Sequence, residues 1–535
     1  MLAISNNIKE TSYIIKDMKW YEKLCLAILI IQIIFITYTN FFLIPDTLDN
    51  DAAKLFLHTI EIWKNKKIFL PNWVNQTTLE IDCAALLAFP FYGIFKNIYI
   101  AFGLSNLTFI FLYIYILSIL LKRNDMKLVT RIITYIFMLI PFSFGQLLYY
   151  NMMFFAGGQY VVKVLVPLMY IVVLTSDEIG TKEKIIGAIS IILTFIMGVS
   201  SGPYVLVSGI APIVLGYLLC DAIRKKSIKD LFCIKSYYII ILGFFACLGE
   251  LVCIKKHVNT LGNSFSIIPG LDITKSFFSK FSAFFELFGG FSYDGTKVLS
   301  LDGIMLSFKC VFALILLIIC ISAIIFAIRS RLNNELSVYI LCIVTVNFFV
   351  LWFTDTFGTA RYLLVFIIPL YILVADYMET KILSISDKTI RTNTFGIVLF
   401  IIFLELIICN YQVLNNKSFP YFAHENMKYE MIVDFVNEQP EEHVFVVDDN
   451  GQPEIYRMLD LSGEKEYLVY LTDTQTIEVH DYYWSDEYYS WLNDGFLLVG
   501  CDSNTSIDMM PEEIRERSEH IGQVHNYYIY RVNSR

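Results

Sequence analysis

Three carboxylates stand close together near the start of the chain, in the segment Ile44–Asp51. Asp46, Asp49 and Asp51 directly follow an apolar run long enough to cross a membrane. A carboxylate in this place can take the proton of an attacking hydroxyl group as a general base. Alternatively, Asp49 and Asp51 could supply oxygen ligands to a divalent cation. A structural interpretation also stands, because acidic residues before a helix cap it and interact favourably with its positive end.

An arginine far along the chain is the second candidate for chemistry. Arg361 and Tyr362 follow the polar stretch Thr354–Thr359 and begin another long apolar run. The planar guanidinium group suits bidentate binding of phosphate. The start of a helix also favours anions, so an anion bound to Arg361 would meet two favourable fields. The structural alternative is an interfacial arginine whose charged end reaches water.

Two more residues are candidates for contacts with a substrate. Lys163, close to Gln159 and Tyr160, could contact a phosphate. His58 is a single histidine on a predicted interfacial helix, where we expect a solvated side chain, with a contact to substrate as the functional alternative. Ionisable residues inside apolar runs are functional candidates by default. Three such residues lie near the ends of their runs, where pairing or snorkelling also explains them: Glu250, Asp376 and Glu405.

Composition decides the broad class of the protein. Of 535 residues, 56% are hydrophobic and only 17% are charged, against roughly 25% charged residues in soluble chains. That composition excludes a soluble globular protein, a disordered chain and a nucleic-acid-binding module. The sequence therefore predicts an α-helical polytopic membrane protein.

Apolar runs predict eleven membrane spans, or thirteen if some runs hold two helices each. Each run approaches the ~20 residues needed to cross ~30 Å of hydrocarbon. The run Cys83–Phe95 is too short, so we expect a re-entrant or interfacial piece broken at Pro90. The predicted spans are 23–44, 98–121, 132–150, 161–175, 185–200, 204–222, 236–254, 304–328, 336–353, 362–378 and 394–411.

Loop charge predicts the orientation of these spans. Lys and Arg collect in the loops around 122–131, 224–229, 329–331 and 381–391, and they are sparse in the loops 151–160, around 201–203 and 354–360. Basic loops stay in the cytoplasm. We therefore expect a cell-membrane protein with a cytoplasmic N-terminus and an extracytoplasmic C-terminal part.

Two predicted outer loops are long, 45–82 and 255–303. The first contains a predicted helix from Asp51 to about Lys64, with Asp49 or Asn50 as its cap. Its polar and apolar residues separate onto two faces, which predicts an amphipathic helix lying in the membrane interface. The second loop is rich in phenylalanine between residues 277 and 288, and we expect it to rest on the membrane near lipid.

Charge also separates the membrane part, residues 1–411, from the tail, residues 412–535. The tail carries 24 acidic and 8 basic residues, whereas the rest of the chain carries 26 acidic and 33 basic residues. This acidity argues against binding to nucleic-acid phosphates. Alternating apolar residues predict a small α/β domain with strands at 443–447, 467–471, 496–500 and 527–532, and helices at 426–437 and 511–519.

Two short motifs resemble the GT-C class of membrane glycosyltransferases, which use sugars carried on polyprenyl phosphates and include protein mannosyltransferases and aminoarabinose transferases. In that class an acidic motif opens the first external loop and leads to an aromatic, apolar and proline stretch. Asp51–Ala53 followed by Ile68–Pro71 is similar to it. The class also shows Arg-Tyr before apolar residues and a proline, as in Arg361–Leu364 and Pro369.

The resemblance implies an inverting transfer of a sugar from a polyprenyl-phosphate donor to a glycan or lipid acceptor at the outer face of the membrane. Asp51, with Asp49 as second choice, would act as the base. Arg361 would steady the departing phosphate, with Tyr362, Asp46, His58 and Lys163 as further substrate contacts. Position 52 is alanine and the loop 151–160 has no acid, so we expect no cofactor and no metal. Two alternative functions stay open: a transporter or lipid flippase, and a membrane scaffold without catalysis. Neither of these would transfer a sugar.

Overall fold

A computed structural model describes most of the chain. The described residues are 18–48, 50–70, 74–75, 79–144, 148–224, 233–255, 259–260, 266–291, 296–356, 359–415, 430–448, 465–471, 476–479, 483–484, 492–500, 506–525 and 527–535.

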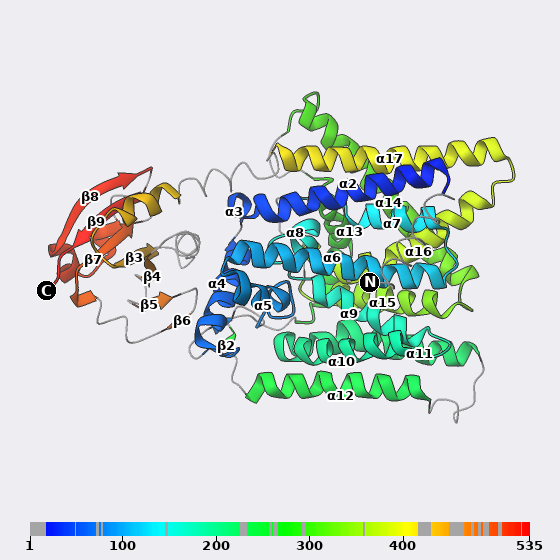
Figure 1. Ribbon diagram of the computed structural model, residues 1–535, viewed down its shortest axis with the longest axis horizontal. Coiled ribbons are helices and arrows are strands. Elements are labelled where there is room, and N and C mark those ends of the chain that lie inside the picture. Colours follow the sequence, from blue (N-terminus) through cyan, green and yellow to red (C-terminus); the bar gives the residue numbers. More distant parts are fainter. Residues whose placement is uncertain are drawn as a thin grey trace, which may run out of the picture.

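Long apolar helices, roughly parallel in Figure 1, form the larger part of the protein. Nine helices in the described residues are long and apolar enough to span a membrane, which confirms the polytopic helical class. They are α2 (Trp20–Phe42), α6 (Ile98–Arg123), α10 (Thr181–Ser201), η1 with α11 (Leu206–Ile210 and Ala211–Ile223), α12 (Ile234–Lys255), α14 (Leu301–Ser330), α15 (Glu335–Phe353), η4 with α16 (Ala360–Leu363 and Leu364–Leu383) and α17 (Lys388–Leu414). Which side of the membrane each end faces stays a prediction.

The other two predicted spans do not form helices of membrane-spanning length in the described residues. The span at 132–150 is wrong as one helix, because α7 (Leu128–Met138) ends before the non-helical residues 139–144 and a second helix, α8 (Tyr149–Phe154), follows. The span at 161–175 is found as α9 (Val161–Leu174), which is almost wholly buried. Non-helical backbone at membrane depth is tolerated where protein covers it, and the described residues from Leu139 to Phe144 are buried.

The predicted break at Pro90 is also wrong. Helix α5 (Ala85–Phe95) runs through the proline. A proline inside a helix removes one hydrogen bond and bends the helix. Here α5 packs on α6 and on α4 (Asn50–Asn65), and this packing holds the helix together.

Helix α4 begins where the sequence predicts it, but it does not lie open in an interface. All side chains from Ala52 to Thr59 are buried, including Lys54 and His58 on the polar face. An amphipathic pattern shows that a helix has two different faces, and not which surroundings each face meets. Helix α13 (Ile273–Leu287), in the second of the two long loops that the sequence predicts to be external, packs against α14 and α15 and leaves Phe278 exposed.

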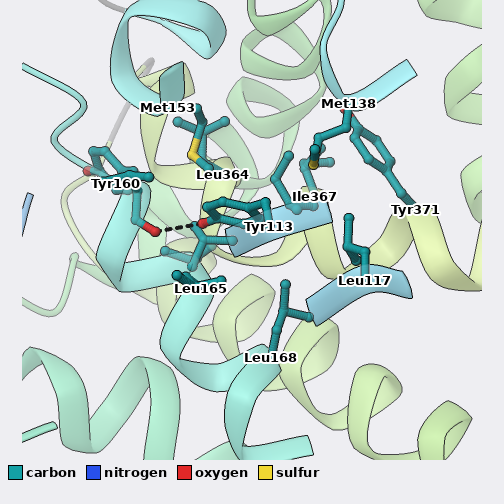
Figure 2. Packing of buried hydrophobic residues seen from close by; sticks show 14 of the residues in the cluster. Tyr113, Leu117, Met138, Met153, Tyr160, Leu165, Leu168, Leu364, Ile367 and Tyr371 are labelled. Carbon is teal, nitrogen blue, oxygen red and sulfur yellow. Dashed lines mark hydrogen bonds between the residues drawn. The ribbon is translucent and has the colours of Figure 1, made fainter. Parts of the chain in front are cut away.

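The turn between α8 and α9 is fixed by polar side chains from α2 and α6. Asn40 donates to the carbonyl of Phe154 at 3.0 Å, and Asn106 donates to the carbonyl of Ala156 at 3.1 Å. Tyr113 on α6 donates to the carbonyl of Val161 at 2.6 Å, the bond drawn in Figure 2. Because these bonds satisfy backbone groups in an apolar core, they set where α9 begins.

The tail contains a seven-stranded mixed sheet, at the end of the molecule away from most of the bundle in Figure 1. Its strand order is β6-β5-β4-β3-β7-β9-β8, with β3 parallel to β4 and β7. A helix covers residues 430–437. The strands are β3 (His443–Asp448), β4 (Glu466–Leu471), β5 (Thr476–Val479), β6 (Tyr483–Trp484), β7 (Phe496–Gly500), β8 (Ser518–Val524) and β9 (Tyr527–Val532).

The four predicted strands are confirmed as β3, β4, β7 and β9, and the tail is an α/β unit as predicted. The helix predicted at 511–519 is wrong in extent, because α20 covers only Glu512–Glu516 and β8 starts at Ser518. Pairing with β9 explains the difference, since it gives the polar residues of β8 backbone partners. The division of the chain at residue 411 stays a prediction.

Candidate functional site

The two residues singled out first in the sequence meet in the fold. Asp51, in the first turn of α4, and Arg361, in η4 at the start of α16, approach to 3.4 Å between Oδ2 and Nη1. Their side chains are 25% and 29% exposed, respectively. A closed charge-assisted hydrogen bond measures about 2.7–2.9 Å. The pair is therefore loose and open to solvent, and both groups stay accessible to a ligand.

Aromatic side chains line the protein side of this pair. The guanidinium carbon of Arg361 lies 6.0 Å from the ring centre of Tyr362, and Tyr160 packs edge-on against Tyr362. Burial raises the pKa of Tyr160 well above its usual value, with a further contribution from Tyr204. The phenol of Tyr160 therefore stays protonated, and its hydroxyl can act as a hydrogen-bond donor.

Lys163, a predicted phosphate contact, has a carboxylate partner instead of an open position. Its ammonium lies 3.5 Å from Asp82, and only 12% of the side chain is exposed. Asp82 is fully buried and accepts hydrogen bonds from Ser200 at 2.6 Å and from Ser201 at 2.7 Å. This arrangement ties α9 and the end of α10 to the segment before α5.

A third pair of opposite charges stands beside the first two. Lys54 of α4 lies 3.5 Å from Glu80, and its side chain is 3% exposed. Glu80 has a φ of 56°, in the left-handed region. Such a conformation is costly for a residue with a side chain, so the surrounding bonds must hold this turn.

His58 is buried, which makes the expectation of a solvated histidine wrong. Burial, followed by the charge of Lys54, lowers the pKa of His58 to about 3. The imidazole is neutral near pH 7, and the side chain is almost completely shielded from solvent. His58 is therefore a packed residue beside the site.

Sequence reasoning missed Asp82, Glu80, Ser200 and Ser201. One signal was present for α4: Asp51, Lys54 and His58 follow a spacing of three and four residues, which places them on one helix face. Asp82 and Lys163 carry no such signal, because they are far apart in sequence. Asp49 lies outside the described residues, and so does the side chain of Asp46, whose backbone belongs to α3 (Ile44–Thr47).

Within the part of the chain that the structure describes, no three His, Cys, Asp or Glu side chains gather as a metal site would require. Close to Asp51 stands the cation of Arg361. The guanidinium of Arg361 is therefore the group beside Asp51 that can bind an anion, in exchange for its contact with the carboxylate.

Comparison with known proteins supports the fold assignment. No protein-family model matches the chain, and no curated protein matches it. Two solved structures of ArnT from Cupriavidus metallidurans are similar. The apo structure gives a TM-score of 0.53 at 8% identity over 98% of both chains. The structure bound to undecaprenyl phosphate gives 0.54 at 8% identity, over 96% of this chain and 98% of that one.

ArnT is an aminoarabinose transferase of the GT-C class. The predicted GT-C-like fold is thereby confirmed over nearly the whole chain. At this identity the likeness shows the fold alone.

Removing the buried carboxylate of Asp82 should destabilise the protein. In Asp82→Asn, Lys163 would keep a poorly solvated charge without its partner, which costs about 3–5 kcal/mol of unfolding free energy. We expect a clear fall in the thermal unfolding midpoint of the detergent-purified protein. Asp177→Asn, an exposed change in the turn between α9 and α10, is the control, and equal midpoints for the two variants would contradict this assignment.

His58 should make the fold sensitive to mild acid. Because its folded pKa lies below the unfolded value of 6.5, the unfolded chain binds the proton first and stability falls as the pH drops below 6.5. Between pH 7 and pH 5 this residue should cost about 2 kcal/mol. His58→Gln should flatten the unfolding midpoint over that range, while His520→Gln, at an exposed site, should leave the slope unchanged. A slope that His58→Gln does not alter would refute the assignment.

Proposed function

We propose that this protein transfers a sugar from a polyprenyl-phosphate donor to an acceptor hydroxyl at the outer face of the membrane. The observation that carries this proposal is the open Asp51–Arg361 pair in a fold like that of ArnT. A structure of ArnT is bound to undecaprenyl phosphate. We extend that ligand class, a lipid phosphate, to this chain.

The proposed reaction is a single displacement with inversion. The acceptor oxygen attacks the anomeric carbon of the sugar, and the bond from that carbon to the phosphate oxygen breaks. The electron pair leaves with the phosphate, which Arg361 stabilises through its charge. The proton of the acceptor hydroxyl passes to the carboxylate of Asp51. Phosphate is already a good leaving group, so no general acid is needed.

The loose geometry of the pair supports these two roles. A donor phosphate would take the place of Asp51 as the partner of Arg361, because its two non-bridging oxygens can pair with the planar guanidinium group as the two oxygens of a carboxylate do. The carboxylate would then turn to the acceptor. Tyr362 would pack beside the donor, since its ring already lies next to the guanidinium group.

Lys163 is proposed as a second contact for the phosphate. Its partner Asp82 already accepts two serine hydroxyls, and the ammonium lies 3.5 Å away from it. The ammonium also donates to the carbonyl of Gln159 at 3.3 Å, and the last of its three N–H groups would bind the anion. His58 is buried and is left out of the substrate contacts.

Loss of the base should remove transfer while the fold survives. Asp51→Asn keeps the size of the side chain and cannot take a proton, so transfer of radiolabelled sugar from a polyprenyl-phosphate lipid should fall by about 10²–10⁴-fold. Glu61→Gln changes another acid on the same helix and should retain activity. Wild-type rates in Asp51→Asn would overturn this role, and absence of transfer by the wild type under a range of sugars would favour a flippase or scaffold.

Arg361 should govern affinity for the lipid phosphate. A charged hydrogen bond is worth about 1.5–3 kcal/mol, so Arg361→Gln should weaken binding of undecaprenyl phosphate by roughly 10–100-fold. Native mass spectrometry of the purified protein can measure the affinity for undecaprenyl phosphate. Undecaprenol, which lacks the phosphate, is the control ligand.

Arg361→Lys should lose less affinity, because it keeps the charge and loses the planar fork. Arg329→Gln removes an exposed charge at the end of α14 and is the matched control. The role of Arg361 is refuted if Arg361→Gln binds the lipid as well as this control does.

A further inference from the structure

A buried lysine in the second external loop holds the segment that leads to Arg361. Lys280 of α13 is only 5% exposed. Its ammonium donates to the carbonyl oxygen of Thr356 at 2.7 Å and to the hydroxyl oxygen of Thr356 at 2.9 Å. The hydroxyl of Thr356, itself buried, donates to the carbonyl of Leu351 at 3.0 Å. One side chain thus fixes the chain just after α15.

The same segment is bound by the chain before α13. Asp355 donates its backbone N–H to the carbonyl of Ser266 at 3.1 Å, and its carboxylate accepts from the backbone and the hydroxyl of Ser266. Ile268 donates to the carbonyl of Phe353 at 3.1 Å. The indole of Trp352 donates to the carbonyl of Ile273 at 2.9 Å. Contacts from residues 266–280 of the loop, up to the middle of α13, therefore hold residues 352–356 in place.

Helix α13 also packs directly against η4, the turn that carries Arg361. Ala360 and Leu363 on either side of that arginine are buried. The backbone position of Arg361 therefore depends on α13. Lys280 links this helix to the segment just before η4, so the two contacts act on the same stretch of chain.

The electrostatics of Lys280 show that packing alone does not explain it. Within the described residues its ammonium is held by a carbonyl and a hydroxyl, without a carboxylate at ion-pair distance. Burial lowers the pKa of Lys280 to about 8. Burying a cation against neutral acceptors is costly, and a methionine would fill the space at less cost. The two directed hydrogen bonds are what the lysine adds.

We propose that Lys280 is a positioning residue, which holds Thr356 and α13 together so that Arg361 faces Asp51. Its consequence for catalysis rests on the proposed function. The clamp itself is a property of the fold and can be tested without any substrate.

The first measurement is hydrogen exchange in the full-length purified protein. In Lys280→Met, amides at 354–356 and 360–363 should exchange about 10-fold faster than in the wild type, since local opening is easier when anchoring bonds are lost. The interior of α16 should not change. Thr356→Val removes the hydroxyl, which accepts from Lys280 and donates to Leu351, but it keeps the bond from Lys280 to the carbonyl, so it should give a smaller change. Lys275→Met, at an exposed position on the same helix, should behave as the wild type.

The second measurement is a double-mutant cycle on affinity for undecaprenyl phosphate. Lys280→Met should weaken binding by about 10-fold, because small displacements of a binding group are costly. If Lys280 acts through Arg361, the double variant with Arg361→Gln should bind no more weakly than Arg361→Gln alone. Fully additive losses would overturn the proposal, and so would exchange rates in Lys280→Met equal to those in Lys275→Met.

The two proposals fail in different ways. If the wild type does not bind the lipid phosphate, or if Arg361→Gln binds it normally, the proposed function is wrong and the exchange rates still decide on the clamp. If Arg361→Gln weakens binding while Lys280→Met changes neither binding nor exchange, the proposed function stands and the positioning role is wrong.

Discussion

The site depends on one ion pair between distant parts of the chain, Asp51 and Arg361. Neither residue can define a site alone, because an acid at a helix start is usually a cap and an interfacial arginine usually reaches water. Their approach to 3.4 Å changes the interpretation of both. This contact requires that α4 is packed inside the fold and that η4 lies next to its first turn. Many of the contacts near the site hold α4 and η4 in these positions.

The three opposite-charge pairs explain how a polar site is stabilised inside an apolar protein. Lys54, Lys163 and Asp82 have little or no exposure to solvent, and buried charges are tolerated only with partners. Each pair joins different segments: α4 to the stretch before α5, that stretch to α9, and α4 to η4. Of these three pairs, the Asp51–Arg361 pair alone has both side chains a quarter or more exposed. The two buried pairs thus fix α4 and the segment before α5 in place, and they stabilise the surroundings of the open pair.

Sequence patterns predicted the long spans, the start of α4, the two residues of the open pair and the four central strands of the tail. These features depend on local periodicity or on a residue type that is costly in its surroundings. The Asp82–Lys163 pair and the contact of Lys280 with Thr356 could not be predicted, because tertiary packing alone brings them together. The burial of α4 could not be predicted either, because a membrane interface and a protein interior select the same amphipathic pattern. The break between α7 and α8 is marked in the sequence by one proline, Pro141, and by no run of polar residues. The sequence therefore does not predict how far the break extends.

A structure of the full chain with undecaprenyl phosphate, determined by cryo-electron microscopy in a lipid nanodisc, tests the role of the open pair most directly. We expect the phosphate within hydrogen-bond distance of the guanidinium group of Arg361, with the carboxylate of Asp51 released toward an empty acceptor position. A phosphate bound elsewhere, with the Asp51–Arg361 pair closed and intact, would contradict this role.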